Sequence, residues 1–302
     1  MSLSSALRIT LAALLCTCAL QAHAAISCTL SATSVNLNYV NSQVTNANAS
    51  GAITLNCTRL STDATTQTYW VGIDFGSRTG TPRRVFRHGG GTVNADRLDV
   101  NIYKNGTTTE WTNTGTARVN GTLNFGAALS ASVVLTYDFR AAALQAGNTA
   151  GIYDEIFIAS LQLTTAGAVT ATTTFVPTVS IIAQCFVGQV ATGNLATGAV
   201  SPSTMTLAYT SFATADQTAN MNFTVHCTRN TTYTLVLAPT SGTLLGLNYT
   251  LALSPSGGPP AITGTGLAQP YTVTGTIASG QAGTCSTATC TATQGATLTV
   301  TY

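Results

Sequence analysis

Charged side chains are scarce in this chain. Asp, Glu, Lys and Arg make up 7% of its 302 residues, against about 25% in an ordinary soluble domain. Disorder is not predicted, because 45% of the residues are hydrophobic and apolar positions alternate with polar ones. The formal net charge of +2 gives no indication of a nucleic acid partner. This composition is typical of an exported β protein with a surface of Thr, Ser, Asn, Gly and Ala.

Long apolar runs are also absent, except near the N-terminus. Arg8 is followed by an apolar run over residues 9–20 and then by Ala22, His23 and Ala24. The run is too short to cross the roughly 30 Å hydrocarbon core of a membrane. A basic residue, a short apolar run and a small-x-small site are the signature of a secretory signal. We therefore predict a signal peptide over residues 1–24.

Catalytic and metal-binding patterns are missing as well. Only His88 and His226 remain after cleavage, whereas a zinc site needs several Cys or His ligands close together. No Gly-x-Ser-x-Gly motif is present, and the adjacent Asp154 and Glu155 should point to opposite faces of a strand. We expect no enzyme, no metal and no cofactor. A carbohydrate-binding module stays open as a less favoured alternative, because sandwich folds host many functions.

No helical periodicity of useful length is present, whereas two-residue alternation recurs along the chain. Ile53, Leu55 and Cys57 form one apolar face, and Tyr69, Val71, Ile73 and Phe75 form the next. Short alternating strands separated by Gly and Asn turns predict β-sandwiches. The expected fold class is therefore all-β.

The alternation is clearest over residues 169–185, where Val169, Ala171 and Phe175 share one parity with Val179 and Ile181. Pro177 interrupts it, because proline cannot donate to the ladder of a central strand. We interpret this stretch as two strands that meet at a proline. The first closes a domain over residues 25–176, and the second opens a domain over residues 178–302.

The pattern of the first domain repeats in the second. Six cysteines remain after signal cleavage, and two of them stand in a shared Cys-Thr-Arg motif, at Cys57 and Cys227. Gln145-Ala-Gly recurs at Gln281. A repeat of this length indicates two related domains rather than a solenoid. The halves differ in charge, since Asp216 and Arg229 are the only charged side chains from residue 178 onward.

These motifs, together with Leu-x-Val-x-Ile-Tyr at residues 98–103, a Trp after a turn and Gly-Ile-Tyr-Asp at residues 151–154, resemble the spore coat protein U domain. That family is similar in turn to the pilins of archaic chaperone–usher pili. The resemblance implies immunoglobulin-like sandwiches that lack their last strand. It also implies a periplasmic chaperone that fills the groove first, an outer-membrane usher, and the N-terminal donor strand of an adjacent pilin.

Two features of the sequence bear on this scheme. The sequence ends on an alternating strand that carries Leu298, Val300 and Tyr302, so we expect the second domain to lack its final strand and to present an acceptor groove edged by these residues. Only residues 25–27 precede Cys28, which is too short for a donor strand. Such a subunit resembles a tip adhesin that mediates attachment or biofilm formation at the cell surface. A non-tip pilin and a secreted coat-layer protein are the alternatives.

An even number of cysteines in an exported chain predicts disulfides. We pair Cys28 with Cys57 and Cys185 with Cys227, because each pair would join the first strand of a repeat to its second. Cys285 and Cys290 would then bridge a hairpin locally.

Adhesive residues are expected in the first domain, which holds both tryptophans and most of the charge. Trp70 has the parity opposite to the buried face of its strand, and aromatic residues anchor interfaces. The bland alternatives are that Trp111 packs on its own hairpin and that a loop covers Trp70. The Arg-rich loop around residues 78–91 is a solvated loop or a basic contact surface. The candidates are Trp70, Trp111, Arg83, Arg84 and Phe86.

Overall fold

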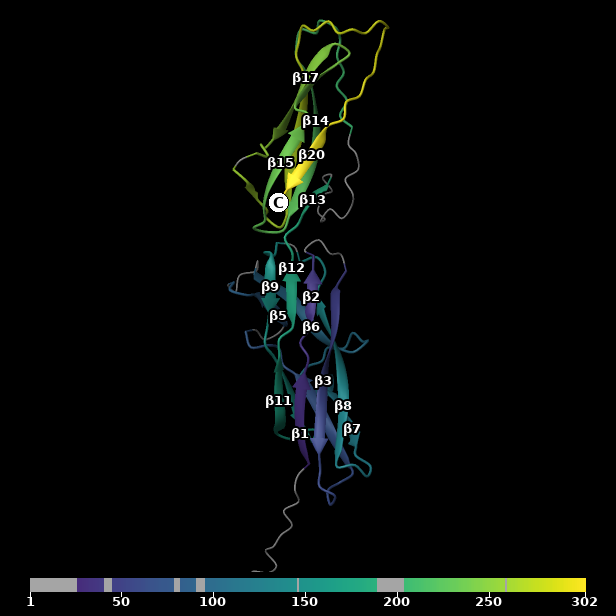
Figure 1. The fold of residues 1–302 in the computed structure, drawn as a ribbon, viewed down its shortest axis with the longest axis vertical. Helices are drawn as coiled ribbons and strands as arrows, with labels where there is room; N and C mark the ends of the chain where they lie inside the picture. Colours follow the sequence, from purple (N-terminus) through teal and green to yellow (C-terminus); the bar gives the residue numbers. More distant parts are fainter. Residues whose placement is uncertain are drawn as a thin grey trace, which may run out of the picture.

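The structure is a computed structural model that describes residues 26–302, except 41–44, 79–81, 91–95, 146, 189–203 and 259. The predicted signal peptide lies outside the described residues. Two β-sandwiches are stacked end to end along the long axis (Figure 1), and the prediction of an all-β fold is confirmed. The strands of the first sandwich are β1 (Ser27–Ala32), β2 (Asn36–Tyr39), β3 (Ala47–Thr58), β4 (Thr66–Ile73), β5 (Arg84–Arg87), β6 (Arg97–Lys104), β7 (Val119–Asn124), β8 (Ser130–Ala141), β9 (Gly151–Asp154), β10 (Phe157–Gln162), β11 (Val169–Phe175) and β12 (Thr178–Ile181).

The first sandwich packs an eight-stranded sheet, in the order β1-β3-β8-β6-β5-β9-β12-β2, against the four-stranded sheet β11-β10-β4-β7. Alternate residues of both sheets face inward, as expected for two-residue periodicity. Ile53, Leu55, Val71 and Ile73 are fully buried between the sheets. The core is therefore continuous from the β1–β3 edge to the β12–β2 edge.

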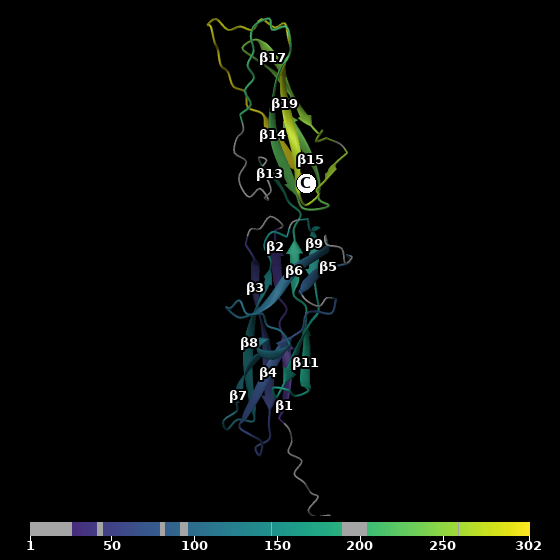
Figure 2. The ribbon, with the colours of Figure 1, turned by 180° about the vertical axis from the view of Figure 1, so that it is seen from behind.

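The second sandwich has fewer strands. They are β13 (Cys185–Gly188), β14 (Gln217–Cys227), β15 (Thr232–Ala238), β16 (Ser241–Leu244), β17 (Leu247–Ser254), β18 (Ile262–Thr263), β19 (Ala268–Ile277) and β20 (Thr297–Thr301). They form the sheets β13-β14-β19-β17-β16 and β18-β15-β20. Seen from behind, β14 and β19 run the length of this sandwich (Figure 2). Its core is built around Phe223, Val225, Leu235, Tyr271 and Val273.

The predicted domain boundary at Pro177 is wrong. β12 pairs in parallel with β2 and antiparallel with β9, so it belongs to the first sandwich. Val179 is fully buried there and Ile181 is 2% exposed. These two apolar side chains keep the parity of β11 across Pro177. The strands before and after Pro177 therefore both contribute to the first core. The second sandwich therefore begins after Ile181, not at residue 178.

Two further local predictions are corrected. The Arg-rich segment read as a loop contains the strand β5, which pairs with β6 and β9. The strand expected to carry both Asp154 and Glu155 ends at Asp154 as β9, and the chain continues from Phe157 as β10 in a different sheet. At the break, the buried Glu155 carboxylate accepts hydrogen bonds from the backbone N–H groups of Ser77 and Ile156 and from the Ser77 hydroxyl. A buried carboxylate with several donors fixes the chain where it changes sheets.

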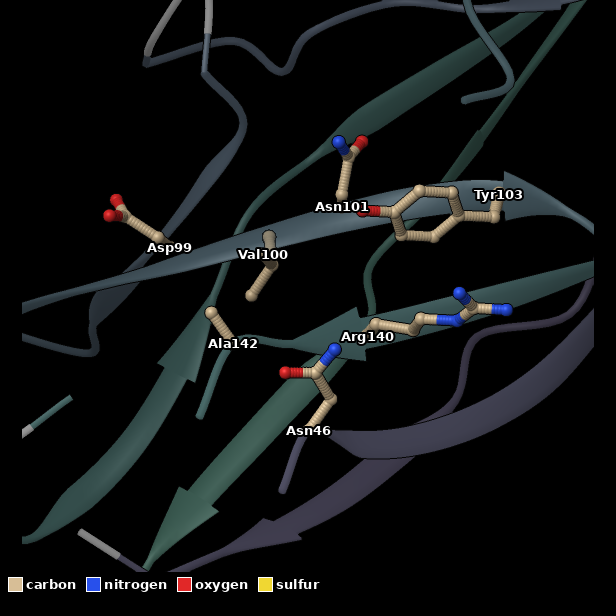
Figure 3. A pocket seen from close by; sticks show the side chains of 7 residues that line it. All are labelled: Asn46, Asp99, Val100, Asn101, Tyr103, Arg140 and Ala142. Atoms are coloured by element: carbon tan, nitrogen blue, oxygen red, sulfur yellow. The ribbon is translucent and has the colours of Figure 1, made fainter. Parts of the chain in front are cut away.

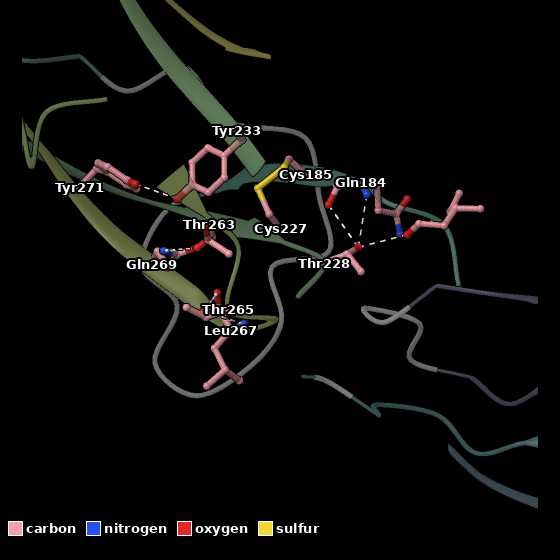
Figure 4. The surroundings of a disulfide bond; sticks show 11 residues. Gln184, Cys185, Cys227, Thr228, Tyr233, Thr263, Thr265, Leu267, Gln269 and Tyr271 are labelled. Atoms are coloured by element: carbon pink, nitrogen blue, oxygen red, sulfur yellow. Dashed lines mark hydrogen bonds between the residues drawn. A yellow bond between two sulfur atoms is a disulfide. The ribbon is translucent and has the colours of Figure 1, made fainter. Parts of the chain in front are cut away.

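The junction between the sandwiches is short. Residues 182–184 connect β12 to β13, and Thr149 forms a parallel bridge with Arg229 across the junction. Thr228 contacts the linker, since its hydroxyl bonds the carbonyl oxygens of Ile182 and Gln184 (Figure 4). Each sandwich also carries a disulfide between paired strands: Cys28–Cys57 joins β1 to β3, and Cys185–Cys227 joins β13 to β14. Cys285 is bonded to Cys290, in a loop without strands rather than in the predicted hairpin.

Candidate functional site

The closing strand of the first sandwich shows how a complete groove is filled. β11 pairs antiparallel with β10, and Phe175 is 2% exposed. The Phe175 ring lies 5.3 Å from the Tyr137 ring and 5.8 Å from the Phe157 ring, centroid to centroid. Val169, by contrast, is 51% exposed and Ala171 is partly exposed. The three predicted closing residues therefore differ in burial, and among them Phe175 is the one that completes the core.

Beyond Pro177 the same strand continues along β2. The backbone N–H of Thr178 donates to the carbonyl oxygen of Val35 at 2.8 Å, and Val179 and Ile181 lie opposite Leu37 and Tyr39. The side chain of Thr178 bonds that of Asn36 at 2.7 Å. β11 and β12 thus act as one closing segment: β11 pairs with β10, and β12 pairs with β2 on one side and with β9 on the other.

A shared hydrogen-bond motif aligns the two sandwiches residue by residue. In the first, Tyr39 Oη accepts from the Gln145 backbone N–H at 3.0 Å, and the Gln145 side chain bonds both backbone groups of Asp99. In the second, Tyr209 Oη accepts from the Gln281 N–H at 2.8 Å, and the Gln281 side chain bonds both backbone groups of Asn248. Burial raises the pKa of Tyr39 above its usual value.

The alignment extends from this motif to the disulfides without a gap. The spacing from Tyr39 to Cys57 equals that from Tyr209 to Cys227, and both cysteines lie in the strand that pairs with β1 or β13. It follows that residues 35–39 correspond to residues 205–209, and β8 corresponds to β19. A search for Leu-x-Tyr upstream of each Cys-Thr-Arg would have found this match in the sequence.

The second sandwich lacks a closing strand at the corresponding place among the described residues. In the part of the chain that the structure describes, no strand corresponds to β11 or β12. β20 pairs with β15 on one side only. The segment over residues 204–208 takes the place of β2, and no hydrogen bond joins its backbone to another described residue. Two unpaired backbone edges therefore flank one side of the core.

Apolar side chains along this groove are only partly covered. Leu298 and Val300 of β20 alternate with exposed threonines and are partly exposed, and Tyr302 beyond the strand is 62% exposed. Val187 and Leu237, which pack at the margin of the same core, are also partly exposed. Leu298 and Val300 thus pack against the second core from a strand whose other edge is unpaired.

Three of the predicted adhesive residues are buried, so they cannot contact a surface. Trp111 is fully buried, and its indole N–H donates to the Val71 carbonyl oxygen at 2.8 Å. Arg83 is 1% exposed and donates to the carbonyl oxygens of Ile73 and Ile102, and burial lowers its pKa to about 10. Phe86 is 4% exposed beneath the Arg78 guanidinium. All three residues are therefore structural: Phe86 lies in β5, Arg83 directly precedes it, and Trp111 follows β6.

Trp70 and Arg84 are the adhesive candidates that reach the surface. Trp70 is partly exposed on the outer side of β4. The Arg84 side chain is 25% exposed and forms a 2.9 Å ion pair with Asp99. The structure does not bring the two residues together in one strand pair, since β4 and β5 lie in different sheets.

A small hollow of about 190 Å³ lies on the outer face of β6 and β8 (Figure 3). Its arginine, Arg140, already bonds Asp138 at 3.1 Å and covers the Tyr103 ring at 4.4 Å. Asp99 at its rim is held by Arg84. These groups are committed to contacts within the domain, so the hollow defines no binding chemistry. The residues that line it are Asn46, Asp99, Val100, Asn101, Tyr103, Arg140 and Ala142.

Other site types have no support in the described part of the chain. Among these residues, no cluster of three or more His, Cys, Asp or Glu is arranged to hold a metal ion. None of the described helices has the length and apolar character to cross a membrane.

The chain is similar to subunits of surface fibres. A chain of the CsuC–CsuE chaperone–tip adhesion subunit pre-assembly complex, from archaic chaperone–usher Csu pili of Acinetobacter baumannii, is 10% identical, with 91% of this chain and 100% of that chain covered and a TM-score of 0.46. A chain of a chaperone–tip adhesin complex in CFA/I fimbriae biogenesis is 9% identical, with 90% and 96% covered and a TM-score of 0.31. AggA, the major subunit of aggregative adherence fimbriae of Escherichia coli, is 17% identical, with 52% and 95% covered and a TM-score of 0.31.

No curated protein matches the sequence. The family model of the Spore Coat Protein U domain, however, matches residues 14–160. The match covers most of the first sandwich, from its leading strand to β10, so this part of the chain is similar to a spore coat protein U domain.

Proposed function

We propose that this chain is an adhesive subunit of a surface pilus whose second domain is completed by a strand from another subunit. The observation that carries the proposal is the open groove, seen against the first domain, which fills the corresponding groove with β11 and β12. The spore coat protein U match supports the same class of protein. The missing strand would run antiparallel to β20 and parallel to residues 204–208, as the closing segment does in the first domain.

Energetics favour an occupied groove. A fully buried aliphatic or aromatic side chain contributes roughly 1.5–3 kcal/mol, and Leu298, Val300 and Leu237 forgo part of that contribution while the groove is open. Unpaired edges beside apolar side chains also invite association. A periplasmic chaperone that covers the groove before assembly fits this requirement, and an usher would then guide the exchange for the strand of an adjacent pilin.

We place the subunit at the pilus tip, because the first domain is closed by its own strand and only the second domain is open. The first domain would face outward and mediate attachment or biofilm formation. Trp70 and Arg84 are its remaining candidate contact residues. A non-tip pilin or a secreted coat-layer protein is the alternative role for the same fold.

The test joins residues 169–181 to the C-terminus of the mature chain through a flexible Gly/Ser linker. A matched control carries Asp at the positions equivalent to Phe175, Val179 and Ile181. We expect the apolar strand to raise the unfolding temperature of the second domain by more than about 10 °C. It should also slow hydrogen exchange in β20. Equal calorimetric transitions in the fusion, the control and the unfused chain would refute strand acceptance.

A further inference from the structure

Two side-chain pairs in the core differ between the domains in the same way. In the first domain Gly51 lies opposite Tyr137 across β3 and β8, and the Tyr137 ring occupies the space where a Gly51 Cβ would point. In the second domain the corresponding pair across β14 and β19 is Met221 and Val273. The rigid ring on one strand is replaced by a flexible thioether on its neighbour.

In the second pair, too, an aromatic ring of the first domain is replaced by a methionine at the neighbouring position. Phe139 is fully buried in the first domain, and Val35 is 8% exposed. Their counterparts are Gly275 and Met205, and a Cβ added to Gly275 would lie 2.5 Å from Met205 Cε. Met205 therefore fills the space above Gly275 from the unpaired segment over residues 204–208. Apart from Met1, these are the only methionines of the chain.

Both positions face the site of the missing strand. Tyr137 contacts Phe175 of β11 at 5.3 Å, and the carbonyl oxygen of Val35 accepts the hydrogen bond of Thr178. By correspondence, Met221 would lie under the side chain of an incoming strand, and Met205 would pair with its backbone. Both methionines are partly exposed at the margin of the second core.

Methionine suits a surface that must fit more than one shape. Its unbranched, polarisable side chain fills irregular gaps and tolerates changes in its partner, whereas an aromatic ring has a fixed outline. The first domain always receives the same closing residues, because they belong to its own chain. The second domain has no such fixed occupant among the described residues.

We propose that Met205 and Met221 form an adaptable floor that lets the open groove accept apolar strands of different side-chain bulk. The inference rests on the proposed function, since it concerns the same groove. The occupant is an extended strand of another polypeptide, with alternating apolar side chains that vary in size at the position equivalent to Phe175.

The experiment uses the mature chain fused to residues 169–181, with Ala, Leu, Phe or Trp at the position equivalent to Phe175. Calorimetry gives the unfolding temperature of the second domain for each fusion. The four strands are then tested on a variant that restores the first-domain pair, M221G with V273Y. We expect the spread of unfolding temperatures among the strands to be at least twofold wider in this variant than in the parent chain.

A second measurement avoids dependence on the folding of that variant. Hydrogen peroxide transfers one oxygen atom to a methionine thioether, giving a sulfoxide and water. Mass spectrometry of peptides follows the oxidation of Met205 and Met221 in the unfused chain and in each fusion. We expect every strand that raises the unfolding temperature to slow oxidation of both methionines at least tenfold.

The outcomes separate the two proposals. If no apolar strand stabilises the second domain, strand acceptance itself fails. If strands stabilise it while both methionines oxidise as fast as before, the methionines do not lie under the strand, and the inference is overturned. An equal spread of unfolding temperatures in the parent chain and in M221G/V273Y would also overturn it.

Discussion

The two domains share one plan but differ in how their cores are closed. In the first, Phe175, Val179 and Ile181 are at most 2% exposed and seal the side of the sandwich. In the second, the same side ends at partly exposed Leu298 and Val300. The comparison teaches that the first domain is an internal template for the second. It shows which backbone edges, and which core positions, an added strand would contact.

The largest expected effect comes from opening the first domain. Phe175→Ala should lower its free energy of unfolding by about 3–5 kcal/mol, because it removes a buried ring packed on Tyr137 and Phe157. Chemical denaturation followed by tryptophan fluorescence reports on this domain, which holds both tryptophans. Val169→Ala is the control, since Val169 is 51% exposed and its loss should change stability by less than about 0.5 kcal/mol. Equal effects of the two changes would contradict the assignment of Phe175 as the closing residue.

The next effect compares disulfides. Removal of Cys28–Cys57 by paired Ala substitutions should cost the first domain roughly 3–4 kcal/mol in the chain-entropy model, given its sequence separation of 29. Cys285–Cys290, with a separation of 5 in an exposed loop, closes a much shorter loop and should cost less. Thermal unfolding of the two double variants checks the order, and a larger loss from Cys285/Cys290 would show that this loop supports the open core.

High pH should lower the stability of the two domains by different, smaller amounts. Burial raises the pKa of Tyr39 and Tyr137, and it raises that of Tyr153 to about 12. These tyrosines stay protonated in the folded state while the unfolded chain loses protons above pH ~10. Stability should therefore fall as pH rises through that range.

In the second domain burial raises the pKa of Tyr233. The stability of this domain should therefore also fall as pH rises, but fewer groups contribute. Arg83 opposes the trend in the first domain, because its lowered pKa favours the folded state at high pH. Calorimetry between pH 9 and pH 11 (about one unit either side of the tyrosine value) should show the larger loss in the first domain. A larger loss of stability in the second domain would contradict the burial of the Tyr39, Tyr137 and Tyr153 hydroxyls.

The smallest effect on stability is expected at the remaining contact candidates. Trp70→Ala and Arg84→Ala should change the unfolding free energy little, since an exposed ion pair such as Arg84–Asp99 contributes only about 0.2–1 kcal/mol. Surface attachment should nevertheless fall while the number of assembled pili stays constant. Arg118→Ala serves as the matched control on another part of the domain. Attachment equal to that of the parent in both variants would exclude these residues from the adhesive face.

Much of this architecture follows from alternation alone. Strict two-residue periodicity identifies β11, β14 and β20 in the sequence, and the repeated cysteines identify their partners. The assignment of β12 could not be read in this way, because parity shows that Val179 and Ile181 share a face but not which core that face meets. The parallel pairing with β2 depends on a contact between residues far apart in the chain.

The adhesive candidates failed for a related reason. Arg83 and Arg84 are adjacent, so their side chains point to opposite sides of a strand. One arginine is therefore buried with its hydrogen bonds satisfied by carbonyl oxygens, and the other reaches the surface. Sequence reasoning that treats the segment as a loop cannot separate them. Parity could not have identified β5 either, because the adjacent Val85 and Phe86 are both buried and the segment lacks two-residue alternation.

The direct passage from β12 through residues 182–184 into β13 has a mechanical consequence. A tensile force on the second domain enters the first through β12, which is hydrogen-bonded to β9 on one side and to β2 on the other. The force is parallel to these strands, so it loads their hydrogen bonds together in shear instead of peeling them one at a time. On the other side of the linker, the Cys185–Cys227 bond carries the force covalently into β14. The strand that completes the first core is thus also the tether through which the molecule resists being pulled apart.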